Sequence, residues 1–377
     1  MSHQPPSPAD TVTFFAALQH LPDPRDKRGK RHDLAFVLCG VVLAIMVGRS
    51  RVSAIHRFLH NRFEWLRATT QASGARCISR AHLPRLLARV DGEALNTLIQ
   101  THLGVRLESG AGGEWIAVDG KALRGSPGEQ VLLARTHQSG HILAQQPLSG
   151  PKRSEVTAVR TLLAQPQLQG QKVTVDAAHC NPTTTAQIHQ AQGTYLVQVK
   201  ANQPTLLTAV RALAETAVPL GTCQSVGKTH GRWEERTATF FSLAPLALPP
   251  RWQPCGLQAV VRVARTTEQL TTRKRSQAVA YYVTNQSVTT PAVHAELFTA
   301  IRGHWGCEAD HWIRDVTLQE DLVPVQQSTQ AHVLAALRTL VLGLFRRAGV
   351  SNMRAMLDAL VDSPTWFSQW LGQVGFL

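Results

Sequence analysis

EWIAVDGKALR at residues 114–124 decides the fold, together with KVTVDAAHCN at residues 172–181. In both stretches an aspartate, Asp119 or Asp176, directly follows a short run of apolar residues. Short runs rich in valine and isoleucine predict buried β-strands. The two aspartates are therefore expected at strand ends, where α/β folds place their ligand chemistry. A single aspartate there is usually a turn or cap residue, but two in matched settings favour a shared site.

Strand and helix patterns alternate around these two segments. Further strands are expected at 131–136, 141–146 and 194–200, and helices at 155–163, 183–192 and 205–216. This order predicts an α/β fold with a mixed sheet, helical crossovers and helices on both faces. At 218–286 the apolar period becomes two, which predicts a β-rich insertion with strands at 237–241, 257–263 and 278–283.

The first hundred residues show helical spacing instead. Helices are expected at 11–18, 34–48, 53–66 and 80–103, and near the other end of the chain at 293–314 and 330–347. We divide the chain into a disordered tail at 1–9, an all-helical N-terminal domain at 10–108 with a DNA-binding or associated role, a first core part at 109–217, the insertion at 218–286 and the completion of the core at 287–377.

The composition of the chain indicates its type of binding partner and its cellular compartment. The 39 Lys and Arg residues against 25 Asp and Glu residues give a net charge of +14, which favours a polyanion, most often nucleic acid. The cationic segment 21–33 fits either a phosphate contact or a solvated linker. The apolar run at 34–48 is shorter than the roughly 20 residues of a membrane span. Scattered cysteines without a C-x-x-C pair and a start without a signal-peptide core indicate the cytoplasm, with no membrane partner.

A third carboxylate, Glu308, lies in IRGHWGCEADHWIRDVTLQED at 301–321. Phosphodiester cleavage commonly uses two Mg²⁺ ions that activate the nucleophile and stabilise the leaving oxygen. Mg²⁺ prefers oxygen ligands, so Asp119, Asp176 and Glu308 are expected to bind it. Glu320 is the reserve for the third ligand.

The same stretch has a competing interpretation. On one continuous helix, His304, Glu308 and His311 would share a face because they are spaced i, i+4 and i+7. Two histidines and a carboxylate are typical of zinc or non-haem iron sites, which would make the protein a His/Glu metallohydrolase. Structural histidines, or histidines that contact DNA, remain open alternatives.

Several motifs together resemble bacterial insertion-sequence transposases of the DDE type, and within these the ISAs-type branch with the H-repeat-associated proteins. They are LPDPRDKRGKRHDLAFVLCGVVLAIMVG at 21–48, IAVDGKALRGS at 116–126, SEVTAVRTLLAQ at 154–165, VTVDAAHC at 173–180, YLVQVKANQPTL at 195–206, THGRWEERTA at 229–238, YYVTN at 281–285 and the 301–321 stretch. The resemblance implies an RNase H-like core with Asp119, Asp176 and Glu308 as catalytic residues. It implies Mg²⁺, with Mn²⁺ as substitute, double-stranded DNA at transposon ends and target, a homodimer on DNA and a nucleoid-associated location.

The resemblance also suggests which side chains contact DNA. These are Lys121, Arg124, Lys200, Asn202, Gln203, His230, Arg232, Arg236 and His304. The chain departs from the family pattern around Glu308: Ile301, His304 and Asp315 replace the Tyr, Arg and Lys of a common signature, and the spacer after Glu308 is one residue short. A catalytically inactive or domesticated DNA-binding relic is therefore an alternative function.

Overall fold

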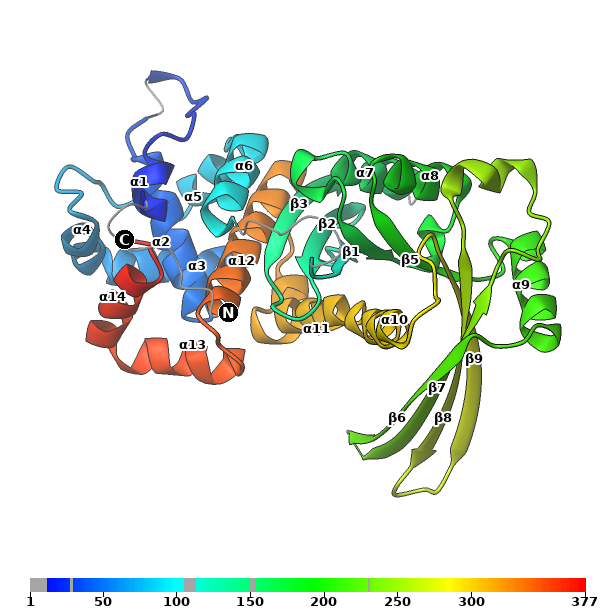
Figure 1. The fold of residues 1–377 in the computed structure, drawn as a ribbon. Coiled ribbons are helices and arrows are strands. Elements are labelled where there is room, and N and C mark those ends of the chain that lie inside the picture. The colour runs from blue at the N-terminus through cyan, green and yellow to red at the C-terminus, as the bar shows by residue number, and fades with distance from the viewer. Residues whose placement is uncertain (1–11, 28–29, 105–112, 150–152, 230) are drawn as a thin grey trace.

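The computed structural model describes residues 12–27, 30–104, 113–149, 153–229 and 231–377, so the tail predicted at 1–9 lies outside it. The described strands form one nine-stranded sheet in the order β3-β2-β1-β4-β5-β9-β8-β7-β6 (Figure 1). The strands are β1 Ile116–Ala122, β2 Glu129–Thr136, β3 Ile142–Ser149, β4 Lys172–Val175, β5 Thr194–Val199, β6 Gly221–Thr229, β7 Arg232–Ser242, β8 Ala259–Gln269 and β9 Arg275–Thr284.

The centre of the sheet places the two aspartates side by side. Strand β1 runs parallel to β4, which runs parallel to β5, whereas β2 and β3 are antiparallel additions on the other side. Val118 lies opposite Val175 as the last pair between β1 and β4. Asp119 and Asp176 follow that pair directly. Strand β1 continues to Ala122 by pairing with β2. Asp119 therefore lies within a strand, which corrects the sequence-based expectation that it lies at a strand end.

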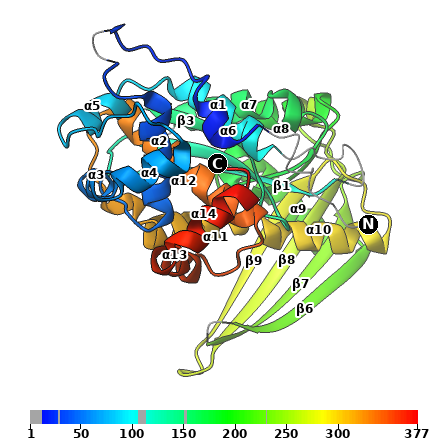
Figure 2. The ribbon, with the colours of Figure 1, turned by 90° about the vertical axis from the view of Figure 1, so that its left-hand side faces the viewer.

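The β-rich insertion extends the central sheet. Strand β9 pairs antiparallel with β5, and β8, β7 and β6 follow outward. The far halves of these long strands project from the body of the molecule (Figures 1 and 2). Strand β6 was missed in the sequence because its mostly exposed residues, GTCQSVGKT, show no apolar alternation.

Helices cover both faces of the sheet, as predicted. The helices are α1 Phe14–Leu18, α2 Leu34–Met46, α3 Val52–Asn61, α4 Phe63–Thr70, α5 His82–Leu87, α6 Gly92–Leu103, α7 Arg153–Leu163, α8 Pro182–Gln190, α9 Pro204–Thr216, α10 Pro291–Gly303, α11 Gly306–Trp312, α12 Ser328–Arg347, α13 Met353–Asp362 and α14 Pro364–Gln373. Helices α7, α8 and α9 share an apolar cluster with one face, and α10 packs on the opposite face. The mixed α/β architecture is therefore confirmed.

Helices from both ends of the chain share one core. Apolar side chains of α1–α6 pack with those of α12–α14 and with one side of β2. Figure 2 shows the helices from both ends of the chain gathered together. The backbone amides of Phe14 and Phe15 donate to the carbonyls of Gly375 and Phe376, at 3.0 Å each, which joins the two ends. The predicted helix at 80–103 divides in two because Asp91 caps α6, its carboxylate accepting from the amides of two following residues. The domain bounds remain a prediction.

Two helices explain the most apolar segments. Helix α2 is buried along its whole length, as expected for the run at 34–48. Among the described helices, only α12 is long and apolar enough to cross a membrane, and 83% of its apolar stretch is buried inside the protein. Burial in the shared core accounts for its composition.

Candidate active site

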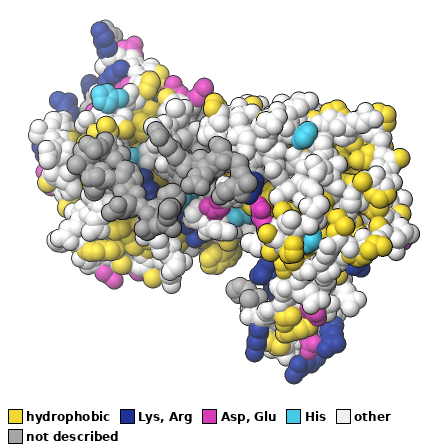
Figure 3. All heavy atoms as spheres, viewed as in Figure 1, with side chains coloured by type: hydrophobic (Ala, Val, Ile, Leu, Met, Phe, Trp, Pro, Cys, Tyr) yellow, Lys and Arg dark blue, Asp and Glu magenta, His cyan; other side chains and the backbone are white. Residues whose placement is uncertain are grey.

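Asp119, Asp176 and Glu308 line one cavity of about 230 Å³. Strand β1 contributes the first carboxylate, the end of β4 the second and α11 the third. Thr174, Gln198, Lys200, Tyr282, His304 and Trp305 also line it. In Figure 3, Asp and Glu side chains gather in the middle of the molecule, above the projecting strands. The structure thus brings together the three carboxylates that the sequence singled out.

Asp119 is held in a strongly acidic setting. Its Oδ1 accepts a hydrogen bond from the Gly120 amide at 2.9 Å, and His311 Nδ1 lies 3.9 Å from its Oδ2. Burial, together with the negative charges of Asp176 and Glu155, raises the pKa of Asp119 to about 7. A cation in the cavity would relieve this repulsion.

Asp176 is fixed by the turn that follows it. Its Oδ1 accepts from the Ala178 amide at 2.9 Å and so caps the short 3₁₀ turn Ala177–His179. Asn202 Nδ2 donates to the Ala177 carbonyl at 2.7 Å. Asn202, predicted to contact DNA, therefore holds this turn through its amide and supports the position of Asp176.

Sequence reasoning missed Glu155 and His179. His179 Nε2 lies 3.7 Å from Asp176 Oδ1 and 3.8 Å from Glu155 Oε1, and its side chain is 1% exposed. This imidazole bridges the two carboxylates. A signal was present for His179, which lies three residues after Asp176 in DAAHC. Glu155 lies in the motif SEVTAVRTLLAQ at 154–165, but its position on α7 beside Asp119 follows only from the folded structure.

Glu308 lies in the first turn of α11 with an exposed side chain. The helix is anchored by Asp310, which is 2% exposed and pairs with Arg135 at 2.8 Å and Arg346 at 2.7 Å. A Cβ at position 306 would collide with the Arg135 guanidinium, so Gly306 is needed where α11 begins. Asp310 therefore positions the helix and adds no free charge to the cavity.

The continuous helix predicted at 293–314 is wrong. Helix α10 ends at Gly303, α11 begins at Gly306, and a π-helical turn follows at Ile313–Thr317. His304 caps α10 and its Nδ1 lies 2.9 Å from Thr174 Oγ1, so it does not share a regular helical face with His311.

The candidate metal ligands are not drawn into a tight cluster. Across the described residues, no group of three His, Cys, Asp or Glu side chains is close enough to hold a metal ion. The set His304, Glu308 and His311 therefore forms no ligand cluster. The same finding applies to Asp119, Asp176 and Glu308, which line a shared open cavity without forming a closed cage.

Lys121 lies in a buried ion cluster. Its Nζ is 2.5 Å from Asp315 Oδ1 and 3.2 Å from Asp321 Oδ1, and its side chain is 4% exposed. A DNA phosphate does not reach it there, which corrects the sequence interpretation. The reserve ligand Glu320 is likewise committed, because Arg314 donates two hydrogen bonds of 2.8 Å to its carboxylate.

The other predicted DNA contacts are spread over the surface. Lys200 is exposed and lines the cavity, whereas Gln203 Oε1 accepts from Arg251 at 3.4 Å. Arg124 is 82% exposed beside Asp321. Arg232 is exposed at the start of β7 and Arg236 pairs with Glu234. His230 lies outside the described residues.

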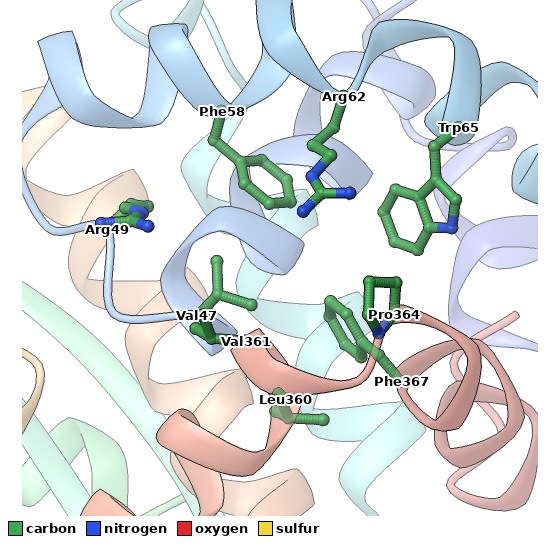
Figure 4. A pocket seen from close by; sticks show the side chains of 9 residues that line it. All are labelled: Val47, Arg49, Phe58, Arg62, Trp65, Leu360, Val361, Pro364 and Phe367. Carbon is green, nitrogen blue, oxygen red and sulfur yellow. The ribbon is translucent and has the colours of Figure 1, made fainter.

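A second, smaller cavity has a different character. It measures about 70 Å³ and lies among α3, α4, α13 and α14, lined mostly by apolar side chains and by Arg49 and Arg62 (Figure 4). It contains none of the predicted catalytic residues. The carboxylate-lined cavity is therefore the candidate site.

Comparison with known proteins shows what the chain is similar to. A family model described as DDE_Tnp_1-associated matches residues 15–103. "Putative transposase YncI" of Escherichia coli O157:H7 is 26% identical over 355 residues, covering 89% of this chain and 88% of that protein. The chain is thus similar to putative bacterial transposases.

Two further proteins are also similar to this chain. "H repeat-associated putative transposase YhhI" of Escherichia coli K12 is 26% identical over 264 residues, covering 66% of this chain and 68% of that protein. "Uncharacterized protein in dhlA 3'region" of Xanthobacter autotrophicus is 29% identical over 225 residues, covering 57% of this chain and 76% of that protein. The transposase-type resemblance stated from the motifs is thereby confirmed.

Proposed function

We propose that the protein is a DDE transposase that cuts DNA at insertion-sequence ends and joins the freed ends to target DNA. The observation that carries this proposal is the meeting of Asp119, Asp176 and Glu308 at one cavity. These residues are 57 and 132 positions apart in the chain (176 − 119 and 308 − 176). The adjacent parallel strands β1 and β4 and the helix α11, which packs against β1, bring these residues together.

Strand order supports an RNase H-like core. Strands β3-β2-β1-β4-β5 are consecutive in the sheet, with β1, β4 and β5 parallel and β2 antiparallel. In this arrangement the two aspartates occupy neighbouring strands, and the insertion lies between β5 and the helix with Glu308. The proposal therefore treats β6–β9 as an addition at one edge of that core.

The carboxylates that line the cavity support a role for divalent cations. Mg²⁺ keeps several waters and binds through one or two carboxylates together with substrate phosphates, so an open arrangement suits it. Asp119 and Asp176 would be the firm ligands, and Glu308 would complete the set. When bound, the ions would activate the attacking water and stabilise the leaving oxygen. Mn²⁺ would substitute because it accepts the same oxygen ligands.

The chain's own residues would hold the DNA around this centre. Lys200, at the end of β5, is placed to bind a phosphate beside the carboxylates. Trp305, 54% exposed at the cavity, offers a face on which a displaced base could stack. Processing two ends at once would require a homodimer on DNA, acting at the bacterial nucleoid.

Cleavage of end-containing DNA tests the proposal. Asp119→Asn, Asp176→Asn and Glu308→Gln should each abolish nicking in Mg²⁺ or Mn²⁺ while DNA binding persists. Asp358→Asn is a matched control, because Asp358 lies on α13 in a surface pair with Arg354. Binding without nicking by the wild-type protein, in both metals, would identify a DNA-binding relic instead. That alternative is favoured by the altered residues around Glu308.

A further inference from the structure

The sheet face that bears the cavity continues onto the insertion. Gln198 of β5 and Tyr282 of β9, which both line the cavity, are opposite each other in the ladder, and Tyr282 is opposite Val261 of β8. Alternate residues of a strand share a face, so Arg265, four residues after Val261, points to the same side. That side chain is exposed.

Arg265 directly opposes a second arginine. In the β7–β8 ladder its partner is Arg236. Like charges at opposite positions of adjacent strands are destabilising. Arg236 forms an ion pair with Glu234 on its own strand, whereas no carboxylate of the described residues lies within ion-pair distance of Arg265.

A third arginine approaches from the helix that covers this face. Arg302 is exposed near the end of α10, next to Ile301, which lines the cavity. Burial lowers the pKa of Arg236, and the charges of Arg302 and Arg265 lower it further against the opposing effect of Glu234. The charges of Arg265 and Arg302 therefore both act on Arg236, on a surface continuous with the carboxylate cavity.

We infer that Arg236, Arg265 and Arg302 form a phosphate-binding site for a DNA strand that leaves the carboxylate cavity across β5, β9 and β8. This inference rests on the proposed function. The anionic DNA backbone would offset the repulsion between the arginines. A guanidinium group can also donate two parallel hydrogen bonds to the oxygens of one phosphate. The site lies three to four strands away from β4, which precedes Asp176, and four residues further along the strand direction. These two displacements place it roughly 20 Å from Asp176. That length corresponds to about six nucleotides of one DNA strand.

The surface distribution of charge agrees with this path. Lys and Arg side chains lie along the projection formed by β6–β9, next to the acidic middle of the molecule (Figure 3). Lys200 follows β5 and Tyr282 is on β9, and these two strands lie between β4, which precedes Asp176, and β8, which bears Arg265. A strand that leaves the acidic centre would therefore meet Lys200, then Tyr282, then the three arginines.

Arg265→Ala and Arg302→Ala test the site against a matched control, Arg262→Ala. Arg262 is on the same strand as Arg265, but it pairs opposite Tyr281 and so lies on the other sheet face. The probe is a fluorescein-labelled DNA duplex of arbitrary sequence with a single-stranded extension, titrated without divalent metal at several salt concentrations. Each test variant should bind about tenfold more weakly. The salt slope should also fall by about 0.9 for each phosphate that the variant no longer neutralises.

Thermal unfolding without DNA separates a binding role from a folding role. Removal of one of three repelling cations should leave Tm unchanged or raise it, while DNA binding weakens. Test variants that bind like Arg262→Ala would overturn the inference even if the wild-type protein cleaves DNA. A different outcome is also possible: the test variants bind DNA more weakly, but the wild-type protein does not cleave it. That outcome would support the arginine site and reject the catalytic proposal.

Discussion

Lys121 Nζ lies 2.5 Å from Asp315 Oδ1, and this buried contact connects the strand of Asp119 to the turn that follows the helix of Glu308. Asp119 is two residues before Lys121, and Glu308 is seven residues before Asp315. Glu320 and Asp321 also face the ammonium, at 3.7 and 3.2 Å. The spacing of the candidate catalytic elements therefore depends on one buried cation.

Replacement of that cation should destabilise the fold. Lys121→Met leaves three carboxylates without their shared partner, and breaking a buried ion pair costs about 3–5 kcal/mol. Urea unfolding at neutral pH measures the loss. Arg124→Ala is the control, because Arg124 is exposed beside the same Asp321 and should change stability by less than about 1 kcal/mol. Equal losses in both variants would contradict a buried role for Lys121.

Glu320 should make stability fall in acid. Although burial alone would raise it, Arg314 and Arg338 hold the pKa of Glu320 below its usual value. A lowered folded-state pKa stabilises the protein above the unfolded value, near 4.3, and this contribution is lost as pH falls through the folded value. Urea unfolding measures the free energy of unfolding from pH 6 down to pH 3. This free energy should decline less in Glu320→Gln than in the wild-type protein, because the variant is already destabilised at pH 6. A parallel decline in both proteins would exclude Glu320 as the source.

His102 should add a second acid-sensitive contribution at higher pH. Burial lowers its pKa to about 4, assisted by the charge of Arg347. A depressed histidine pKa means that the folded state prefers the neutral ring, so its contribution is complete above pH 6.5 and is lost as pH falls towards 4. The shift corresponds to roughly 3 kcal/mol. His102→Gln should flatten the unfolding profile in that window, whereas His20→Gln should not, since His20 lies on the exposed surface.

The sequence predicted well those elements whose apolar pattern is local. Strand β4 and helix α2 follow directly from the runs at 172–176 and 34–48. The pairing of the site was also predictable, because parallel neighbours place Asp119 beside Asp176. Strand β6 was not, since its stability comes from pairing with β7 and its residues carry no periodic signal.

The remaining errors come from long-range contacts. The position of Lys121 after a catalytic candidate in a glycine-containing segment predicts a phosphate ligand, but carboxylates 194 to 200 positions away (315 − 121 and 321 − 121) neutralise it. Gly306, where α11 begins after the break, lies so close to Arg135 of β2 that a Cβ there would collide with its guanidinium. Neither contact leaves a trace in the local sequence, because both partners lie on elements that only the folded sheet brings together.

Divalent cations should stabilise the protein through Asp119 and Asp176. Without metal, Asp119→Asn should raise Tm at pH 8, because Asp119 is buried beside Asp176 and Glu155 and its charged form is disfavoured. With Mn²⁺ at about a hundred times its Kd, the wild-type protein should gain about 2.7 kcal/mol, a rise of several degrees in Tm. Asp119→Asn and Asp176→Asn should lose this rise, and Asp358→Asn should keep it. A Mn²⁺-induced rise that survives in Asp119→Asn and Asp176→Asn would place the cation elsewhere, and it would remove the physical basis for catalysis at this cavity.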